Sequence, residues 1–432
     1  MDIASLHQLF LKHPIVCTDT RKIAANSLFF ALKGEKFNAN QFASQALSQG
    51  AAYAIIDEAQ YKISEQFILV DDVLTTLQQL AAFHRDTLKI PVVAIVGSNG
   101  KTTTKELITS VLKQKFTVLA TPGNFNNHIG LPLTMLQITK SHEIAVIEMG
   151  ANHIGENEFL CKIAKPSHGI VTNNGKDHLE GFGDMEGVAK SNSELYYYLL
   201  KNNGIAFVNM HDEWLMRMAR QLENKVTYAA NFEGRNKEAS HTCYASHLQP
   251  TINFTIDTSS LEINSNLSGD YNFDNITAAV SMGLYFGLNI SQIAKGIESY
   301  KPSNNRSEVI KKESNTIYLD AYNANPSSME VSIKNFAAMP FGNKVLILGD
   351  MFELGKYAEE EHQNLVHFCE ALGLTNVFLC GDLFKNTKNY YVCFATTEEC
   401  KGYLSENKLM DSNVFMKGSR GMKLETLMEV ID

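Results

Sequence analysis

A phosphate-binding loop is the first group of residues in this sequence with clear chemical meaning. The apolar run Val92–Val96 leads into Gly97, Ser98, Asn99, Gly100, Lys101, Thr102 and Thr103. Glycines let backbone N–H groups close around phosphate oxygens, and a helix that begins at such a loop adds its dipole. Lys101 would then reach the outer phosphates of ATP, and the Thr102 hydroxyl would bind Mg²⁺. The general pattern has another glycine where this chain has Ile95, and an ordinary strand-to-helix turn is the alternative.

Two polar groups follow later apolar runs and predict further parts of the same site. Glu148 ends the run Ile144–Ile147, and His178 comes soon after the run Gly169–Val171. Because ligands bind outside the carboxyl ends of parallel strands, both side chains would lie on the side of the loop. A carboxylate there suits Mg²⁺, and an imidazole suits a metal or a phosphate. The alternatives are a solvated glutamate at a strand end and a structural histidine.

The last third of the chain contributes a polar segment after another apolar run. Thr316–Leu319 is followed by Asp320, Ala321, Tyr322, Asn323, Ala324, Asn325 and Pro326. Asn and Pro are common where helices begin, so a capping turn is one interpretation. A carboxylate, a phenol and two amides side by side are also what a site needs to hold ribose hydroxyls and a polar peptide. Arg306, which precedes this segment, could reach a phosphate with its planar set of donors.

These groups need elements that bring them together, and the chain alternates between strand-like and helix-like runs. We predict an α/β fold of three domains: a small N-terminal α/β domain (1–88), a central P-loop domain with a mostly parallel sheet (89–301) and a C-terminal Rossmann-like α/β domain (302–432). Residues 225–265 change to short strands with polar turns, which predicts an antiparallel extension of the central sheet. A helix is expected at Asn275–Phe286, after the turn at Gly269.

The composition limits the class of protein. Of the 432 residues, 44% are hydrophobic and 20% are charged, and the net charge of -9 argues against a general nucleic-acid or membrane-surface role. No apolar run approaches the ~20 residues that span a bilayer, and the N-terminus lacks the pattern of a signal peptide. The seven cysteines form no C-x-x-C pair, which favours reduced, structural thiols. We expect a cytoplasmic protein without membrane insertion, and a monomer by default.

The motifs together resemble the Mur ligase family of ATP-dependent amide ligases. Besides the phosphate loop, the matching segments are Thr121–Asn127, Glu148–Gly150, His178–Gly183, Asn272 with Asn275, Asp320–Pro326, Gly349–Gly355 and Lys417–Arg420. The resemblance runs from Asp19 to Arg420, essentially the whole chain. Tyr322–Pro326 is similar to the segment of the family member that adds D-alanyl-D-alanine to UDP-MurNAc-tripeptide, rather than to the members that add earlier residues.

The resemblance implies a reaction in which ATP phosphorylates the C-terminal carboxylate of UDP-MurNAc-tripeptide and the amine of D-alanyl-D-alanine attacks the acyl phosphate. A carboxylate reacts poorly with amines until its oxygen becomes a good leaving group, so this route is chemically reasonable. The implied catalytic residues are Lys101, Glu148, His178 and Arg306. One Mg²⁺ would lie between Thr102 and Glu148, and a second between Glu148 and His178.

The same resemblance distributes the binding roles over the three domains. ATP would contact the loop 97–103 together with Asn275, Arg306, Asp320 and Tyr322. The implied substrate-binding residues are Thr18, Asp19, Thr20, Arg21 and Ser27 for the uridine nucleotide, Asn126 and Asn127, and Asn323 and Asn325 for the incoming dipeptide. The first domain departs from the family at Asn40-Gln41-Phe42, where a Gly-His pair is usual.

A second departure bears on the second metal. The segment Gly187–Leu195 aligns with a family segment whose carbamylated lysine helps to bind that ion, and this chain has Asn192 at the position. An amide cannot form a carbamate, and Lys190 is two residues away, which on a helix is a different direction. We therefore expect this protein to work without a lysine carbamate.

Two other functions are alternatives. A folate polyglutamate ligase has the same three-domain plan and the same acyl-phosphate route, but it should lack the segment Tyr322–Asn325. A regulatory or scaffold protein that lost catalysis would have Asn192 as a trace of that loss. It would not need Lys101, Glu148 and His178.

Overall fold

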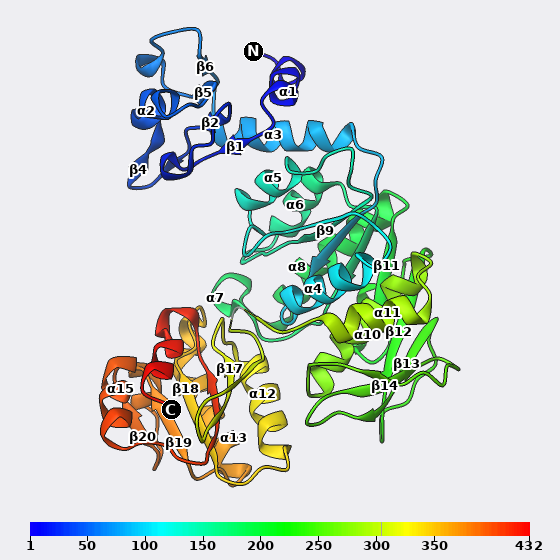
Figure 1. The fold of residues 1–432 in the computed structure, drawn as a ribbon, viewed down its shortest axis with the longest axis vertical. Helices are drawn as coiled ribbons and strands as arrows, with labels where there is room; N and C mark the ends of the chain where they lie inside the picture. Colours follow the sequence, from blue (N-terminus) through cyan, green and yellow to red (C-terminus); the bar gives the residue numbers. More distant parts are fainter. Residues whose placement is uncertain (304) are drawn as a thin grey trace.

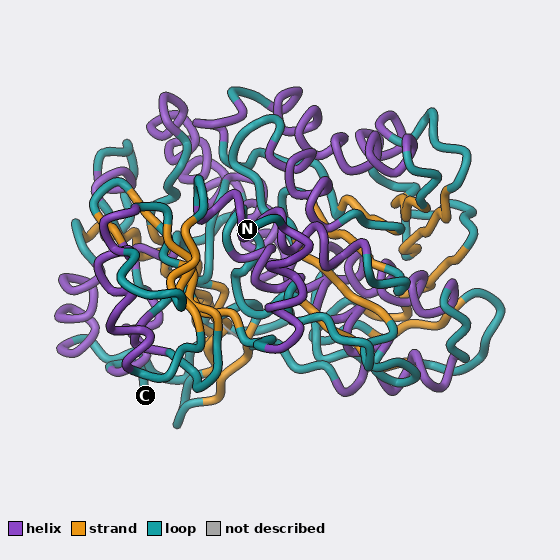
Figure 2. Tube along the Cα trace, turned by 90° about the horizontal axis from the view of Figure 1, so that it is seen from above, coloured by secondary structure: helices purple, strands orange, loops and turns teal. Residues whose placement is uncertain are grey.

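The computed structural model describes residues 1–303 and 305–432, and within them three α/β regions follow one another along the chain (Figure 1). Each region is built around one main sheet, and parallel pairs predominate in all three sheets. Seen from above, helices and loops surround the strands (Figure 2). The predicted α/β fold with mostly parallel sheets is confirmed. No helix of the described residues is long and apolar enough to cross a membrane.

The first sheet has the strand order β1-β2-β5-β6 and only parallel pairs. Its strands are β1 (Val16–Cys17), β2 (Leu28–Phe30), β5 (Tyr53–Ile56) and β6 (Phe67–Leu69), with the small hairpin β3 (Lys33–Gly34) and β4 (Phe37–Asn38) and the helices α1 (Ile3–Lys12), α2 (Ala43–Ser48) and α3 (Val73–Asp86). Helix α3 packs against α1 on one side and against the helices of the central region on the other. One apolar cluster therefore runs from Leu6 through Leu77 to Val92 and joins the first two regions.

The central sheet carries the phosphate loop and has the order β15-β14-β13-β12-β11-β10-β7-β9-β8. Its strands are β7 (Val92–Val96), β8 (Val118–Ala120), β9 (Ile144–Glu148), β10 (His168–Val171), β11 (Ile205–Asn209), β12 (Lys225–Asn231), β13 (His241–His247), β14 (Asn253–Ile256) and β15 (Ile263–Asn264). The helices are α4 (Lys101–Leu112), α5 (Gly130–Met135), α6 (Glu156–Ala164), α7 (Leu179–Phe182), α8 (Met185–Lys201), α9 (Glu213–Met218), α10 (Asp270–Tyr285) and α11 (Ile290–Ser299).

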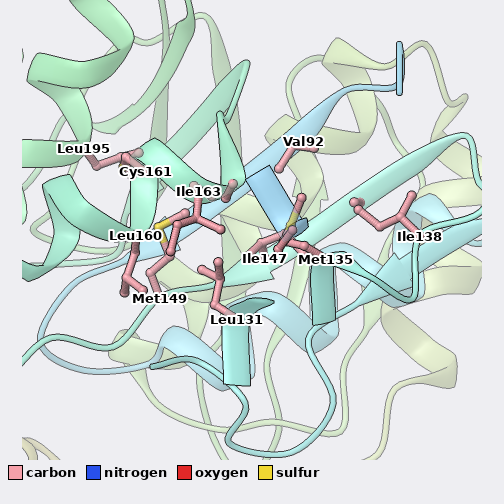
Figure 3. Close-up of a cluster of buried hydrophobic side chains, with 14 of the residues drawn as sticks. Val92, Leu131, Met135, Ile138, Ile147, Met149, Leu160, Cys161, Ile163 and Leu195 are labelled. Carbon is pink, nitrogen blue, oxygen red and sulfur yellow. The ribbon is translucent and has the colours of Figure 1, made fainter. Parts of the chain in front are cut away.

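Side chains alternate between the two faces of a strand, and strand β7 is buried on both faces. Val93 and Ile95 belong to a cluster with helices α4, α10 and α11. Val92 belongs to the cluster on the opposite face, where helices α5, α6 and α8 contribute Leu131, Leu160 and other side chains (Figure 3). Strand β7 is thus fixed from both sides, and with it the loop at its end.

Two expectations for the central region were wrong in part. Strand β12 pairs parallel with β11, and β13 pairs parallel with β12; only the pairs β13–β14 and β14–β15 are antiparallel. The connection 232–240 is short, but an extended segment of this length can span about 30 Å and return along the strand. Helix α10 begins at Asp270, not at Asn275, after Gly269 with a φ of 87°.

The C-terminal sheet has the order β16-β17-β21-β18-β19-β20, with β16 antiparallel at one edge. Its strands are β16 (Glu308–Lys311), β17 (Thr316–Asp320), β18 (Lys344–Gly349), β19 (Val377–Cys380), β20 (Val392–Phe394) and β21 (Asn413–Lys417), and its helices are α12 (Pro326–Ala338), α13 (Ala358–Ala371), α14 (Asp382–Lys385) and α15 (Thr397–Glu406). The short helix α7, between the two regions in Figure 1, places Leu179 and Phe182 in the same apolar cluster as Met351 and Leu354. The carboxyl ends of the central and C-terminal strands thereby come to face each other.

Candidate active site

A cavity of about 1310 Å³ lies where these two sets of strand ends meet. Its walls include residues just after β7, β9, β10 and β11 on the central side and after β17, β18 and β21 on the C-terminal side. The cavity brings together most of the predicted site residues, namely Ser98, Asn99, Gly100, Lys101, Thr102, Thr103, Asn126, Asn127, Glu148, His178, Asn275, Arg306, Asp320, Tyr322, Asn323 and Asn325. Polar residues that follow parallel strands therefore lie together at the edges of both the central and the C-terminal sheet, as predicted.

The phosphate loop leaves β7 at Gly97 and enters helix α4 at Lys101. Gly97 has a φ of 129°, and a Cβ there would lie 2.2 Å from Thr172 Oγ1, so only glycine fits. Ile95, which replaces the usual first glycine, is fully buried inside β7, so the turn of this loop starts two residues later. The ammonium of Lys101 donates hydrogen bonds to the carbonyls of Gly97 and Ser98. It is thus held across the mouth of the loop, where phosphates would bind.

Neighbouring segments hold the loop rigid. Asn99 N donates to Asn173 Oδ1 at 3.0 Å, and Ser98 N donates to the Asn173 carbonyl at 3.1 Å. On the other side, Thr104 Oγ1 donates to Asn275 Oδ1 at 3.0 Å. Asn275 lies so close under the loop that a Cβ on Gly100 would be 2.7 Å from its Oδ1. Asn275, predicted to contact ATP, also supports the loop directly.

Glu148 ends β9 with one of its carboxylate oxygens unpaired. Oε1 accepts a hydrogen bond from Asn126 Nδ2 at 2.9 Å. Oε2 is buried and has no hydrogen-bond partner among the described residues, and the nearest cation, Lys105 Nζ, is 3.8 Å away. A buried carboxylate oxygen without a partner is costly unless a bound ion satisfies it. A hard cation such as Mg²⁺ would pair with this oxygen, and Thr102, the second residue of α4, lines the same cavity.

His178 lies at the junction of the two regions. Its backbone has a φ of 45°, its Nδ1 is 2.6 Å from Glu353 Oε2 and its Nε2 is 3.6 Å from Asp177 Oδ1. Burial disfavours the charged imidazole, but the hydrogen bond to Glu353 and the charge of Asp177 outweigh burial and raise the pKa of His178. The same hydrogen bond lowers the pKa of Glu353. Both shifts favour an ionic pair across the junction.

Asn325 connects the C-terminal region to the phosphate loop. Its Nδ2 donates to Asn99 Oδ1 at 2.8 Å and to Asp177 Oδ1 at 3.0 Å. Its Oδ1 accepts from Ser328 N at 2.8 Å and caps helix α12. The capping turn, one of the two alternatives in the sequence, is thus confirmed, and the same side chain lines the cavity.

Other predicted residues of the C-terminal side lie along the same wall. Lys417 Nζ donates to Asp320 Oδ2 and, at 3.4 Å, to the carbonyl of Asn323. The guanidinium of Arg306 lies 3.5 Å from the centre of the Tyr322 ring. Asp320, Tyr322 and Arg306, which the sequence placed with ribose and phosphate, are therefore neighbours.

The first domain holds the remaining predicted residues, and the structure does not bring them to this cavity. Thr18, Asp19, Thr20, Arg21 and Ser27 lie at the first sheet, which Figure 1 shows on the far side of the central region from the C-terminal one. Arg21 forms an ion pair with Asp19, and this pair lowers the pKa of the Asp19 carboxyl to about 2. Ser27 is fully buried, and its hydroxyl has no hydrogen-bond partner among the described residues.

Comparison with known proteins identifies the family. Residues 14–85 match the Mur ligase family catalytic domain, residues 95–283 the Mur ligase middle domain, and residues 305–399 the Mur ligase glutamate ligase domain. The UDP-N-acetylmuramoyl-tripeptide–D-alanyl-D-alanine ligase of Bacillus subtilis (strain 168) is 36% identical over 431 residues, which cover 96% of this chain and 92% of the relative. The chain belongs to the Mur ligase family.

Solved structures agree with this assignment. A crystal structure of MurF from Acinetobacter baumannii is 31% identical, covers 96% of this Mur ligase and 92% of its own chain, and has a TM-score of 0.84. The MurF ligase of Thermotoga maritima in complex with ADP is 26% identical, covers 97% of both chains and also has a TM-score of 0.84. The predicted family is thus confirmed over nearly the full length.

Two site residues of this Mur ligase carried no separate role in the sequence analysis. Asp177, with a side chain only 7% exposed, lies 3.8 Å from Lys101 Nζ and also contacts His178 and Asn325. Glu353, which pairs with His178, lies in the matched segment Gly349–Gly355 after β18. Their positions after strand ends, the criterion used for Glu148, are the signal that could have identified both.

Asn192 lies behind the phosphate loop of this Mur ligase. It is buried on helix α8, donates to Asn174 Oδ1 at 3.0 Å, and lines a small cavity of about 10 Å³ that Gly97 and Asp177 also border. Lys190 is exposed on the same helix. The two side chains therefore point in different directions, as expected from their spacing.

A change of Asn325 to aspartate should open the junction without removing the helix cap. Asn325→Asp keeps the oxygen that accepts from Ser328 N, but it places a carboxylate oxygen against the carboxylate of Asp177. Leaving such buried groups unpaired costs about 1–3 kcal/mol, so we expect ATP-dependent turnover to fall by about 10- to 100-fold. Phosphate release under saturating substrates measures the effect.

The matched control is Asn289→Asp, at the exposed N-cap of α11, where the side chain accepts from Gln292 N in a capping box. This variant should keep full turnover, because aspartate caps a helix as well as asparagine. Equal turnover by the two variants would show that the contacts of Asn325 with the loop do not matter.

Proposed function

We propose that this Mur ligase joins D-alanyl-D-alanine to the tripeptide carboxylate of UDP-MurNAc-tripeptide, with hydrolysis of ATP to ADP and phosphate. The observation that carries the proposal is the hydrogen bond between Asn99 of the phosphate loop and Asn325 of the segment expected to hold the dipeptide. This contact supports one cavity for the proposed ATP site and the proposed amine site. Curated relatives with this activity in their names, from Bacillus subtilis and Haemophilus influenzae, cover over 90% of both chains at 36% and 34% identity.

The residues of the cavity support an acyl-phosphate route. Lys101 would exchange its contacts with the loop carbonyls for the γ-phosphate oxygens of ATP and neutralise the charge that develops during transfer. Arg306 would hold the same phosphoryl group from the opposite wall. The tripeptide carboxylate attacks the γ-phosphorus, and the dipeptide amine then attacks the acyl carbon and expels phosphate. Closure of the two strand edges would exclude water, which otherwise hydrolyses the acyl phosphate.

We propose Mg²⁺ as the cofactor, held by Thr102 and Glu148, with His178 at a second ion once its imidazole has lost the proton that the pair with Glu353 favours. The unpaired Oε2 of Glu148 fits the first ion. Bound there, Mg²⁺ would supply positive charge to the transferring phosphoryl group. No group of three or more His, Cys, Asp or Glu side chains in the described part of the chain could hold a metal alone. Phosphate oxygens and water would therefore complete the coordination.

The same proposal assigns the domain boundaries and the remaining binding residues. Domain boundaries at 88/89 and 301/302 would separate the uridine-nucleotide domain, with Thr18, Asp19, Thr20, Arg21 and Ser27, from the ATP-binding and C-terminal ligase domains. Adenosine would lie between Asn275 and the wall of Asp320 and Tyr322. Asn126 and Asn127 would contact the peptide substrate, and Asn323 and Asn325 the dipeptide.

We also propose a cytoplasmic monomer, for which light scattering would give a mass near 48.1 kDa.

Release of phosphate from ATP should require UDP-MurNAc-tripeptide and D-alanyl-D-alanine together. Omission of either substrate should abolish turnover, because the acyl phosphate forms only on the tripeptide and is consumed only by the amine. A phosphate assay with each substrate left out in turn, together with mass spectrometry of the amide product, measures this. Phosphate release with a folate and glutamate would instead support the folate polyglutamate ligase, and no release with any pair would support a scaffold.

Bicarbonate should not change the rate of this enzyme. Asn192 occupies the position of the family's carbamylated lysine, and Lys190 is exposed on another side of α8. The activity after removal of dissolved carbon dioxide should therefore equal the activity after bicarbonate is restored. Recovery of activity on adding bicarbonate, or a carbamate on Lys190 in a crystal structure, would contradict this expectation.

A further inference from the structure

The charged side chains of the cavity are mostly neutralised by one another. Among the described residues, the lysines and arginines that line it are Lys101, Arg235, Arg306, Lys417 and Arg420. Lys101 lies near Asp177, Arg235 pairs with Asp274, and Lys417 pairs with Asp320. Arg306 and Arg420 form no ion pair with any described carboxylate, so no carboxylate of the described residues offsets the positive charge of these two guanidinium groups.

Both free guanidinium groups are held by one aromatic ring. Arg306 lies 3.5 Å and Arg420 lies 5.3 Å from the centre of the Tyr322 ring. An arginine over a ring uses its face for that contact and leaves its N–H edge free for a planar anion. Tyr322 therefore keeps two cations on one wall, although they repel each other, and their donors remain open to the cavity.

Arg420 also has a defined position, just after a central strand of the C-terminal sheet. It follows β21, the strand between β17 and β18, and lies three residues after Lys417. The ammonium of Lys417 donates to the carbonyl of Asn323, which is next to Tyr322 in the chain. Arg420 is thus on the C-terminal side of the cavity, beside the segment proposed for the dipeptide and across from the phosphate loop.

The terminal carboxylate of the dipeptide is one anion of the proposed reaction that has no partner so far. The phosphates of ATP have the loop, Lys101 and Arg306, and the uridine nucleotide belongs to the first domain. The dipeptide attacks through its amine, but its own terminal carboxylate stays ionised throughout. Carboxylates buried in a cleft need a charge-assisted partner, and arginine binds them through two parallel N–H groups.

We propose that Arg420 binds the terminal carboxylate of the incoming dipeptide and so selects amine substrates that end in a free acid. This assignment rests on the proposed function, since it names the residue that reads one end of the same substrate. Arg420 is a binding residue and takes no part in bond making. It would set the distance between the carboxylate and the attacking amine, and Tyr322 would hold its guanidinium in place.

A comparison of two ligands on two enzymes tests this. The ligands are D-alanyl-D-alanine and D-alanyl-D-alaninamide, and the enzymes are the wild type and Arg420→Gln, with phosphate release as the readout. The amide cannot form a charge-assisted pair with Arg420. The KM of the wild type for the amide should therefore be about 10- to 100-fold higher than its KM for the acid. Arg420→Gln should raise the KM for the acid by a similar factor and change the KM for the amide and for ATP less than about three-fold.

Arg217→Gln is the matched control. Arg217 also lies over an aromatic ring, that of Trp214, but it is exposed, pairs with Glu186 and is absent from the cavity wall. This variant should leave all the KM values unchanged, and thermal unfolding of both variants shows that they fold.

Three results would count against the assignment. A wild type that uses the amide as well as the acid overturns it without any variant. Arg420→Gln with equal losses for acid and amide assigns a structural role to Arg420 instead. A wild type that does not turn over the dipeptide at all overturns the proposed function, and this assignment with it, whereas the first two results leave the proposed function intact.

Discussion

The carboxylate of Asp177 is the group on which the contact between the two sheet edges depends. It is almost completely buried, accepts a hydrogen bond from Asn325 of the C-terminal region, and lies near the ammonium of Lys101 and the imidazole of His178. A buried charge is stable only when its partners stay in place. The same carboxylate therefore connects the third domain to the central region and places a negative charge 3.8 Å from the ammonium of the loop lysine.

The two opposed sheet edges divide the chemistry between them. The central edge carries groups that bind phosphate and suit a hard cation, namely the loop, Thr102 and the unpaired oxygen of Glu148. The C-terminal edge carries Arg306 and Arg420, both close to the ring of Tyr322, and the amide of Asn325. An acyl phosphate formed between such edges is next to both its donor and its acceptor. An ATP-dependent amide ligase needs this juxtaposition, and neither edge provides it alone.

Sequence patterns predicted the features that depend on residues close together in the chain. The buried strand Val92–Val96, the glycines of the loop and the polar groups after strand ends follow from periodicity and from the geometry of parallel sheets. The pairing of β12 with β13 was missed, because a short connection can return along a strand as well as turn back. Their positions after strand ends could have singled out Asp177 and Glu353 as site residues, but the contacts of these two residues and of Arg420 could not be predicted from the sequence. Their partners, such as Asn325 and Tyr322, are far away in the chain, and only the packing of the third domain brings them together.

Oxygen transfer from the tripeptide to phosphate tests the central claim most directly. If the tripeptide carboxylate is labelled with ¹⁸O and turned over with ATP and D-alanyl-D-alanine, the acyl phosphate carries one labelled oxygen into the phosphate that leaves. Mass spectrometry of the inorganic phosphate should then find one ¹⁸O atom in each molecule formed. Unlabelled phosphate, accompanied by formation of the amide, would show that the carboxylate is not activated by phosphorylation, and it would contradict the account.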